Sequence, residues 1–407
     1  MKIGILAYCS ACNFGAQLQL LSTYMYLKNN GHFPIVINWI PADLEKKYAK
    51  NCPPEQLSLF EAERNRLWKQ TECCHTAEEI ATVIKKEGID AIIVGSDAVL
   101  QHHPLLECVK FPTRSIVSRA RPSSDTLFPN PFWGTFNDYL PQPIPVAVLS
   151  GSNQDSIFKY IGRDTRKKME KYILQYKYVS VRDEWTREMI KYLTNGKVNP
   201  VVTPDPVFAF NQNAGDLVLS KEDLIRKFNL SENYIILSFH GAGIVSQQWI
   251  EDFQILAEKD GYQCVKLPYA DREGYGRIEK VISLPLSPLD WYGLIKYSQG
   301  YVGENMHPII VSLHNGLPVF SFDNYGRKRF NGLITDDSTS KINHILKLAG
   351  LDKNRLSTIN KSFKLDNAQT VYQTLRATDA SKISLFAEKY YEAYKANMET
   401  ILNFLTV

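Results

Sequence analysis

The sequence predicts an α/β protein built from two domains. Short apolar runs alternate with segments of helical periodicity in two successive sets, and the polar stretch 211–216 separates the sets. The chain of 407 residues is also longer than one hydrophobic core usually supports. Strands that alternate with helices form a parallel sheet covered on both faces. We therefore expect two Rossmann-like domains, over residues 1–210 and 211–375, with a central cleft lined by the carboxyl ends of strands.

The first strand–helix unit is the clearest in the chain. Residues 2–8 are an apolar run typical of a buried strand, and residues 14–29 place apolar side chains at helical spacing up to Gly31. Asn13 suits the N-cap of that helix, and Gly15 lets another group approach the backbone closely. Capping alone explains Asn13 about as well as ligand binding does. The unit lacks the Gly-x-Gly-x-x-Gly pattern, which disfavours a dinucleotide.

The rest of the first domain continues the alternation. We predict strands at 33–39, 89–94, 145–149, 178–181 and 199–203, and helices at 76–87, 163–175 and 183–193. The strand at 89–94 ends in Gly-Ser-Asp, so Ser96 and Asp97 lie at its carboxyl end. Arg182 lies between a strand and a helix N-terminus, where a cation needs an anionic partner. That partner is Asp183, Asp205 or a bound anion.

Residues 102–145 break this pattern with many prolines and several aromatic residues. An irregular connection of this length is usually a functional loop. Phe132, Trp133 and Phe136 could stack on a sugar face, but we expect them to pack beneath the loop, because large apolar side chains are more often buried.

The second domain repeats the strand–helix pattern. We predict strands at 234–239 and 263–267, and helices at 247–260, 339–348 and 381–405. His240 follows the first of these strands, and the two glycines after it permit close approach to the backbone, so His240 is a candidate site residue. The last helix, within residues 376–407, is long enough to pack back across the first domain.

The stretch 301–329 is the most informative part of the chain. It predicts a short strand, a polar loop, a helix that starts near Pro308, and a second strand at 319–322. Asn305 and His307 therefore lie where a strand gives way to a helix N-terminus. Such a terminus offers free N–H groups and a partial positive charge, so it suits an anion.

A loop with three cations follows the second strand of this stretch. Arg327, Lys328 and Arg329 could face the same anion as His307. A solvated basic loop and a hydrogen-bonded structural histidine are the plain alternatives.

Five short motifs occur in order along the chain: Asn13-Phe-Gly-Ala16, Gly95-Ser-Asp97, Val181-Arg-Asp183, Asp205-Pro-Val-Phe208 and Gly303-Glu-Asn-Met-His307. Together with the Leu-His-Asn-Gly-Leu-Pro-Val run after the last motif, they resemble the polysaccharide pyruvyl transferase family over about residues 1–330. That family transfers the pyruvyl unit of phosphoenolpyruvate onto sugars. The resemblance implies a GT-B-like fold of two Rossmann-like halves, with the C-terminal helix returning to the first.

The resemblance also implies roles for individual residues. His307 would act as the proton donor or phosphate contact, Arg182 would hold phosphoenolpyruvate, and Asp97 would orient the acceptor. The motifs and their neighbouring loops assign Asn305, Arg327, Lys328, Arg329 and His240 to the donor, and Asn13, Gly15 and Ser96 to the acceptor.

The chain departs from the family pattern at two places. Asn305 stands where the family commonly has arginine, so Arg327 or Arg329 would have to supply the missing charge. Ala98, Val99 and Leu100 follow Gly-Ser-Asp where the family usually has glutamine and an aromatic residue. Two alternatives therefore stay open: a GT-B glycosyltransferase with a nucleotide-sugar donor, and a sugar-binding member without catalytic activity.

The composition indicates an ordinary globular protein, with 44% hydrophobic residues, 22% charged residues and a formal net charge of +4. This small charge gives no argument for nucleic acid. No apolar run reaches the roughly 18 residues of a membrane span, and the N-terminus lacks a signal-peptide pattern. We expect a cytoplasmic protein that could contact the inner face of the membrane peripherally.

We expect no cofactor and no metal, with phosphoenolpyruvate as the donor substrate. The acceptor would be a sugar of a glycan or lipid-linked intermediate in surface or capsular polysaccharide biosynthesis, joined as a pyruvate ketal. Seven cysteines at irregular spacing do not indicate a disulfide framework. The pair Cys9 and Cys12 lacks a second pair at zinc-ligand spacing, because Cys73 and Cys74 are adjacent.

Overall fold

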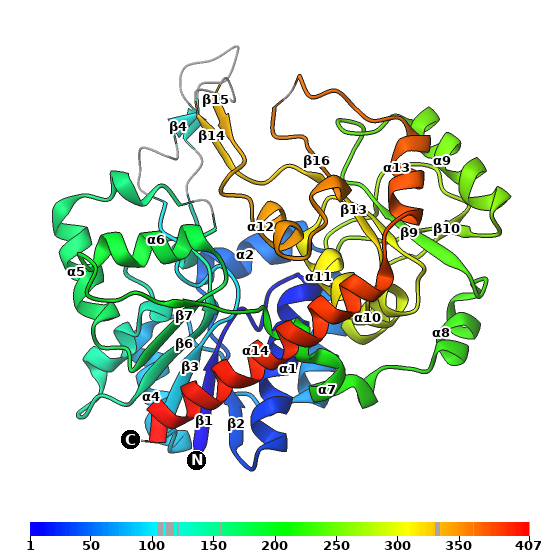
Figure 1. Cartoon of the computed structure of the whole chain (residues 1–407). Coiled ribbons are helices and arrows are strands. Elements are labelled where there is room, and N and C mark those ends of the chain that lie inside the picture. The colour runs from blue at the N-terminus through cyan, green and yellow to red at the C-terminus, as the bar shows by residue number, and fades with distance from the viewer. Residues whose placement is uncertain are drawn as a thin grey trace.

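The structure is a computed structural model, which describes residues 1–103, 109–110, 118–119, 122–154, 156–329, 334–360 and 362–406. It contains two separate six-stranded sheets, and all strand pairings within each sheet are parallel (Figure 1). Helices cover both sheets. The predicted architecture of two Rossmann-like domains is therefore confirmed.

The first sheet is formed by β1 (Lys2–Leu6), β2 (Phe33–Val36), β3 (Ala91–Val94), β6 (Val146–Gly151), β7 (Tyr178–Val181) and β8 (Val201–Val202). Its strand order is β2-β1-β3-β6-β7-β8. The second sheet is formed by β9 (Tyr234–Ser238), β10 (Gln263–Lys266), β11 (Lys280–Val281), β12 (Tyr301–Gly303), β13 (Val319–Asp323) and β16 (Arg355–Ser357). Its order is β11-β10-β9-β12-β13-β16.

Each sheet reverses its strand order at one point, between β1 and β3 in the first sheet and between β9 and β12 in the second. The chain leaves these central strands in opposite directions, so a crevice opens at their carboxyl ends, where ligands bind in open α/β sheets. The central strands are fully or almost fully buried, which explains their continuous apolar sequences.

The helices up to residue 214 are α1 (Phe14–Asn29), α2 (Ala42–Asn51), α3 (Pro54–Leu67), α4 (Ala77–Glu87), α5 (Arg163–Ile173), α6 (Glu184–Leu193) and α7 (Phe210–Ala214). Those that follow are α8 (Lys221–Phe228), α9 (Gln247–Lys259), α10 (Pro288–Lys296), α11 (Met306–His314), α12 (Lys341–Leu348), α13 (Ala368–Arg376) and α14 (Ala380–Thr406). Helix α1 starts where predicted, because the Asn13 side chain accepts a hydrogen bond from the Ala16 N–H at 3.2 Å. Helix α11 starts at Met306, two residues before Pro308.

The C-terminal helix α14 crosses from the second domain to the first, as predicted, and ends near the N-terminus (Figure 1). Tyr394 packs edge-on against Tyr26 of α1, with ring centroids 5.7 Å apart. Asn397 accepts a hydrogen bond from the Tyr178 hydroxyl at 3.0 Å and donates one to the Ser180 hydroxyl at 3.1 Å. These contacts tie the far end of the chain to β7 and so fix one domain against the other.

Phe132, Trp133 and Phe136 have no exposed surface. They lie in short 3-10 turns, Pro131–Trp133 and Thr135–Tyr139. The prediction that these aromatic side chains pack beneath the loop is therefore confirmed.

Two details differ from the sequence prediction. Residues Arg327–Arg329 were expected in a loop but form strand β14, which pairs in antiparallel fashion with β15 (Ile334–Asp336). Cys12 and Cys52 form a disulfide, which the cysteine count did not predict. Cys9 is a free, buried thiol. Within the described ranges, no helix combines the length and apolar character that crossing a bilayer requires.

Candidate active site

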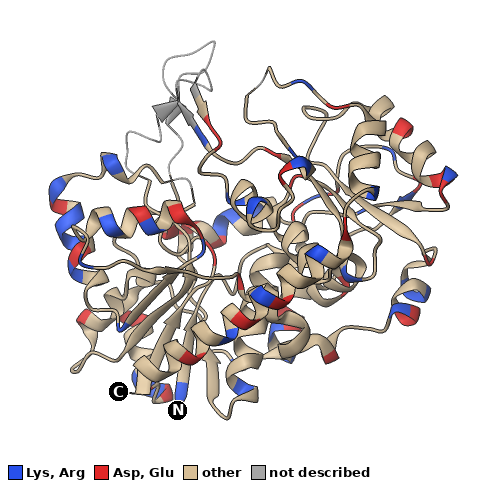
Figure 2. Ribbon diagram, viewed as in Figure 1, with Lys and Arg blue, Asp and Glu red and all other residues tan. Residues whose placement is uncertain are grey.

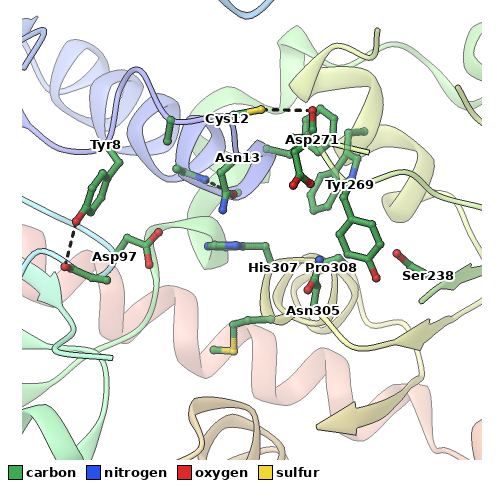
Figure 3. A pocket seen from close by; sticks show the side chains of 18 of the residues that line it. Tyr8, Cys12, Asn13, Asp97, Ser238, Tyr269, Asp271, Asn305, His307 and Pro308 are labelled. Carbon is green, nitrogen blue, oxygen red and sulfur yellow. Dashed lines mark hydrogen bonds between the residues drawn. The ribbon is translucent and has the colours of Figure 1, made fainter. Parts of the chain in front are cut away.

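A cavity of about 430 Å³ opens where the two crevices meet, and both domains line it (Figure 3). The first domain contributes the segment after β1 and the start of α1. The second contributes the segments after β9 and β12. Six of the residues predicted from sequence line this cavity: Asn13, Gly15, Asp97, His240, Asn305 and His307. Residues that follow strands of both sheets therefore line one cavity, in keeping with the central cleft of the predicted fold.

His307 comes from the second domain, and its imidazole lies directly against the backbone of α1 in the first. A Cβ atom placed on Gly15 would be only 2.0 Å from His307 Cγ and 2.3 Å from Nδ1. Only glycine therefore leaves space for the ring at this crossing. The sequence predicted close approach at Gly15 and assigned it to the acceptor, whereas the group that approaches in the structure is the candidate catalytic histidine.

The environment of His307 keeps its imidazole neutral. Burial lowers its pKa from the usual 6.5, and the charges of Asp97 and Asp205 oppose this only in part. Its Nε2 atom has no hydrogen-bond partner among the described residues. Figure 3 shows the ring extending across the cavity toward Asp97. A neutral imidazole with an unpartnered nitrogen can accept a proton or bind an acidic ligand group.

Asp97 is held by a buried ion-pair network below the cavity. Arg182 donates to Asp97 Oδ1 at 3.1 Å and to Asp205 Oδ2 at 2.7 Å, and its own side chain is 4% exposed. Burial disfavours the Asp97 anion, but the adjacent positive charge of Arg182 outweighs this effect and lowers the pKa of Asp97 to about 2. Asp97 is therefore an ionised group at the cavity wall and a weak base.

Arg182 does not line this cavity. Its partners are Asp205, one of the two carboxylates that the sequence offered, and Asp97, which it holds in place. Contact with the donor, which the family resemblance implied, would require Arg182 to exchange a carboxylate partner for the ligand. Ser96 also lies outside the cavity lining, because its hydroxyl is buried and donates to the Ser150 carbonyl at 3.1 Å.

Among the lining residues that the structure describes, Lys341 is the one lysine or arginine, and the sequence prediction missed it. Arg327 pairs with Asp336 and lies 4.2 Å from the centre of the Trp185 ring, outside the cavity lining. The side chains of Lys328 and Arg329 are outside the described part of the structure. Lys341 is the first residue of α12, after the N-cap Ser340. A lysine at a helix N-terminus is unfavourably placed, and this signal could have identified it.

Two further predicted residues lie on the second-domain wall. The His240 ring stacks on Tyr269 with a centroid distance of 3.9 Å, and its Nδ1 is 3.4 Å from Glu304 Oε2. Asn305 is the N-cap residue of α11, but its side chain makes no capping hydrogen bond. Its amide and the first N–H groups of the helix are therefore available to a ligand in the cavity.

Tyr8, Gln101 and Asp125 line the first-domain wall, and the sequence analysis did not identify them. Asp125 lies within the irregular segment 102–145, where no periodicity marks individual side chains. Among the described residues, no group of three or more His, Cys, Asp or Glu side chains is arranged to hold a metal ion.

A sequence model of the family "Polysaccharide pyruvyl transferase" matches residues 13–325. The protein belongs to this family. The match begins at Asn13 and includes Asp97, Asn305 and His307, so it contains lining residues from both walls of the cavity. No curated protein matches the chain at a significant level.

Solved structures support the fold over the whole chain. UDP-GlcNAc 2-epimerase from Methanocaldococcus jannaschii is similar with a TM-score of 0.53 and 12% identity, covering 96% of this chain and 99% of that chain. UDP-GlcNAc 2-epimerase from Neisseria meningitidis, bound to UDP-GlcNAc, gives a TM-score of 0.51 and 13% identity, with coverage of 99% and 100%. A ugt transferase from Siraitia grosvenorii in complex with UDP is similar with a TM-score of 0.50 and 9% identity, covering 100% of this chain and 100% of that chain. At these identities the likeness establishes the GT-B-like fold alone.

Proposed function

We propose that this transferase moves the pyruvyl group of phosphoenolpyruvate onto two hydroxyl groups of one sugar, forming a cyclic ketal in surface or capsular polysaccharide biosynthesis. The observation that supports this most directly is the position of His307. It projects from the N-terminus of α11, lies against Gly15 and extends toward Asp97 inside a cavity lined by both domains. Proton transfer and anion binding can therefore occur at one point.

The donor would bind on the second-domain side of the cavity. Phosphoenolpyruvate carries a carboxylate and a phosphate, which suit the N–H groups at the start of α11. Lys341 supplies a positive charge in the same cavity. It thereby takes the role that we assigned to Arg327 or Arg329, namely to offset the family arginine that Asn305 replaces. The Asn305 amide can still donate a hydrogen bond to a phosphate oxygen.

The reaction needs a proton at the methylene carbon of the enol. Once that carbon is protonated, the neighbouring carbon becomes oxocarbenium-like and a sugar oxygen attacks it. The bond to phosphate then breaks, and a second hydroxyl of the sugar closes the ketal. The two sugar hydroxyl groups release two protons. One replaces the proton that was delivered to the methylene carbon, and the other is taken up by the departing phosphate.

His307 would deliver the proton to the enol. Burial favours the neutral imidazole, but the charges of bound phosphoenolpyruvate would raise its pKa and so favour the imidazolium. Asp97 stays ionised because its pKa is about 2. It would orient the acceptor and stabilise the imidazolium, while Arg182 keeps the carboxylate in position.

Two other functions fit the same fold. The similar structures include UDP complexes, so a nucleotide-sugar donor is one alternative. A sugar binder that has lost activity through Asn305 is the other. Calorimetry with phosphoenolpyruvate, UDP sugars and GDP sugars on one preparation separates them. Binding of a nucleotide sugar without any response to phosphoenolpyruvate would favour the glycosyltransferase, and no response to either donor would favour the inactive binder.

The site of action would be the cytoplasm, at the inner face of the membrane if the acceptor is lipid-linked. Helices α2, α3, α4, α6, α8 and α14 each carry both acidic and basic residues, whereas α5 is predominantly basic (Figure 2). Its cations are Arg163, Arg166, Lys167, Lys168 and Lys171. A basic helix of this kind favours reversible contact with anionic lipid. Binding to anionic vesicles, measured by sedimentation and compared with neutral vesicles, tests this part of the proposal.

A further inference from the structure

A buried carboxylate on the first-domain wall of the cavity lacks one of its hydrogen-bond partners. Asp125 lies in the 3-10 turn Ser124–Thr126 and is 4% exposed. Its Oδ2 atom accepts a hydrogen bond from the Tyr8 hydroxyl at 3.0 Å. Its Oδ1 atom has no partner among the described residues. A buried carboxylate oxygen without a partner is costly, so a ligand that donates a hydrogen bond to this atom would be stabilised here.

Further hydrogen bonds fix the Tyr8 hydroxyl and the turn that carries Asp125. The Gln101 amide donates to the Tyr8 hydroxyl at 2.9 Å, which directs the Tyr8 proton toward Asp125. The Asn130 amide donates to the Asp125 carbonyl at 2.8 Å. Asp43 of α2 accepts hydrogen bonds from both the N–H and the hydroxyl of Ser124, at 2.8 Å and 3.1 Å. The arrangement is therefore a preorganised binding wall.

Charge decides which ligand this wall accepts. Asp97 is already ionised nearby, and the charges of Asp125 and Asp97 both raise the pKa of Tyr8, after burial as the largest cause. An anionic donor such as phosphoenolpyruvate would be repelled here and attracted toward Lys341 and the start of α11. A hydroxyl group satisfies Oδ1 without adding charge. Tyr8 and Tyr48 line the same wall and can contact the apolar face of a sugar ring.

We propose that Asp125 and Tyr8 bind the acceptor sugar, with Asp125 Oδ1 accepting a hydrogen bond from a sugar hydroxyl. The assignment rests on the proposed function in taking the acceptor to be a neutral sugar. The first-domain wall then selects the acceptor, and the second-domain wall holds the donor. Both substrates meet at His307.

The test compares Asp125→Asn and Tyr8→Phe with a matched tyrosine–aspartate pair elsewhere on the domain. Tyr172 donates a hydrogen bond to Asp138 on the exposed surface, outside the cavity. Tyr172→Phe and Asp138→Asn therefore make the same chemical changes away from the site. Methyl glycosides of several hexoses and their 2-amino-2-deoxy analogues are the probes. Their affinities are measured by saturation-transfer NMR with and without phosphoenolpyruvate, and donor affinity is measured separately by calorimetry.

We expect Asp125→Asn to weaken hexose binding by ~10-fold or more, since it removes a hydrogen bond to a charged group, while phosphoenolpyruvate affinity changes less than about twofold. The control variants should match the wild type. Unchanged hexose binding in both cavity variants, or an equal loss of donor binding, would overturn the assignment. A clear preference for the protonated amino sugar would also overturn it, because Asp125 would then be a cation site.

The two levels of the proposal can fail separately. Hexose binding that depends on Asp125, in a protein that never binds phosphoenolpyruvate, would reject the transferase reaction and keep the sugar site. If the protein turns over phosphoenolpyruvate but its affinity for the acceptor is the same with and without the Asp125 carboxylate, the proposed reaction is retained and the proposed sugar site is rejected. Thermal unfolding of each variant identifies any that fail to fold. For those, Tyr8→Phe, which leaves the Asp125 backbone contacts intact, provides the decisive comparison.

Discussion

Gly15→Ala should remove activity far more than stability. The added Cβ would be 2.0 Å from His307 Cγ, 2.3 Å from Nδ1 and 2.4 Å from Cδ2. Carbon atoms pack at about 3.5–4.0 Å, so the imidazole or α1 must shift by about 1.5 Å. A misplacement of about 1 Å can cost about 100-fold in rate. We therefore expect kcat/KM to fall by about 100-fold or more, equivalent to about 3 kcal/mol of lost transition-state stabilisation.

The effect on folding should be smaller. Overpacking a tight site costs about 1–3 kcal/mol, but alanine in place of glycine in a helix recovers up to about 1 kcal/mol. The net change in the free energy of unfolding should therefore be about 0–2 kcal/mol. Phosphate release from phosphoenolpyruvate measures the first effect, and urea denaturation measures the second.

Gly162→Ala is the matched control. A Cβ at Gly162 would meet no heavy atom within 4 Å, and its backbone is in an extended conformation that any residue adopts. This variant should keep wild-type activity. Gly15→Ala with wild-type kcat/KM, or with a loss no larger than that of Gly162→Ala, would refute the proposed seating of His307.

Three further predictions concern charge. Arg182→Ala leaves the buried carboxylate of Asp205 and the partly exposed carboxylate of Asp97 without their shared cation. It should lower the free energy of unfolding by about 3–5 kcal/mol, measured by urea denaturation; a change below about 1 kcal/mol would contradict the ion-pair network. Lys341→Ala should raise the KM for phosphoenolpyruvate by ~10-fold or more, whereas Arg327→Ala, outside the cavity lining, should leave it within about twofold; the reverse pattern would restore the sequence assignment. Burial lowers the pKa of His314 from 6.5 to about 3. Between these two values the unfolded chain binds a proton that the folded chain does not, so the free energy of unfolding decreases as the pH is lowered from about 6.5 to about 3. From pH 7 to pH 5 this one group should cost about 2 kcal/mol, and His314→Gln should show a correspondingly shallower loss; equal slopes in urea titrations would reject the burial argument.

Local patterns were enough to predict the fold and the edge where the site lies. The apolar runs and helical periods of the central strands and α1 are set by burial within short windows, so they are visible in sequence. Because strand carboxyl ends meet in open α/β sheets, Asp97, His240 and His307 could be assigned to one cleft. The predicted domain boundaries near residues 210 and 375 stay predictions.

The features that sequence missed depend on packing between distant segments. The sequence offered several anionic partners for Arg182. Which of them it contacts depends on how its side chain is buried in the folded protein, and this is not visible in the local sequence. Arg327 belongs to a strand that carries it to the Trp185 ring, while Lys341 reaches the cavity from α12. Asp125 lies in a segment without periodicity, so nothing local distinguishes it from other loop residues.

One measurement tests the central claim most directly. The protein is incubated in deuterated water with phosphoenolpyruvate and a sugar acceptor, and both phosphate release and the product are followed by NMR and mass analysis. We predict one phosphate released per ketal formed and one solvent-derived deuterium in the new methyl group, with both signals lost in His307→Ala. Phosphate release without a pyruvylated sugar, or a ketal methyl group free of deuterium, would contradict the mechanism.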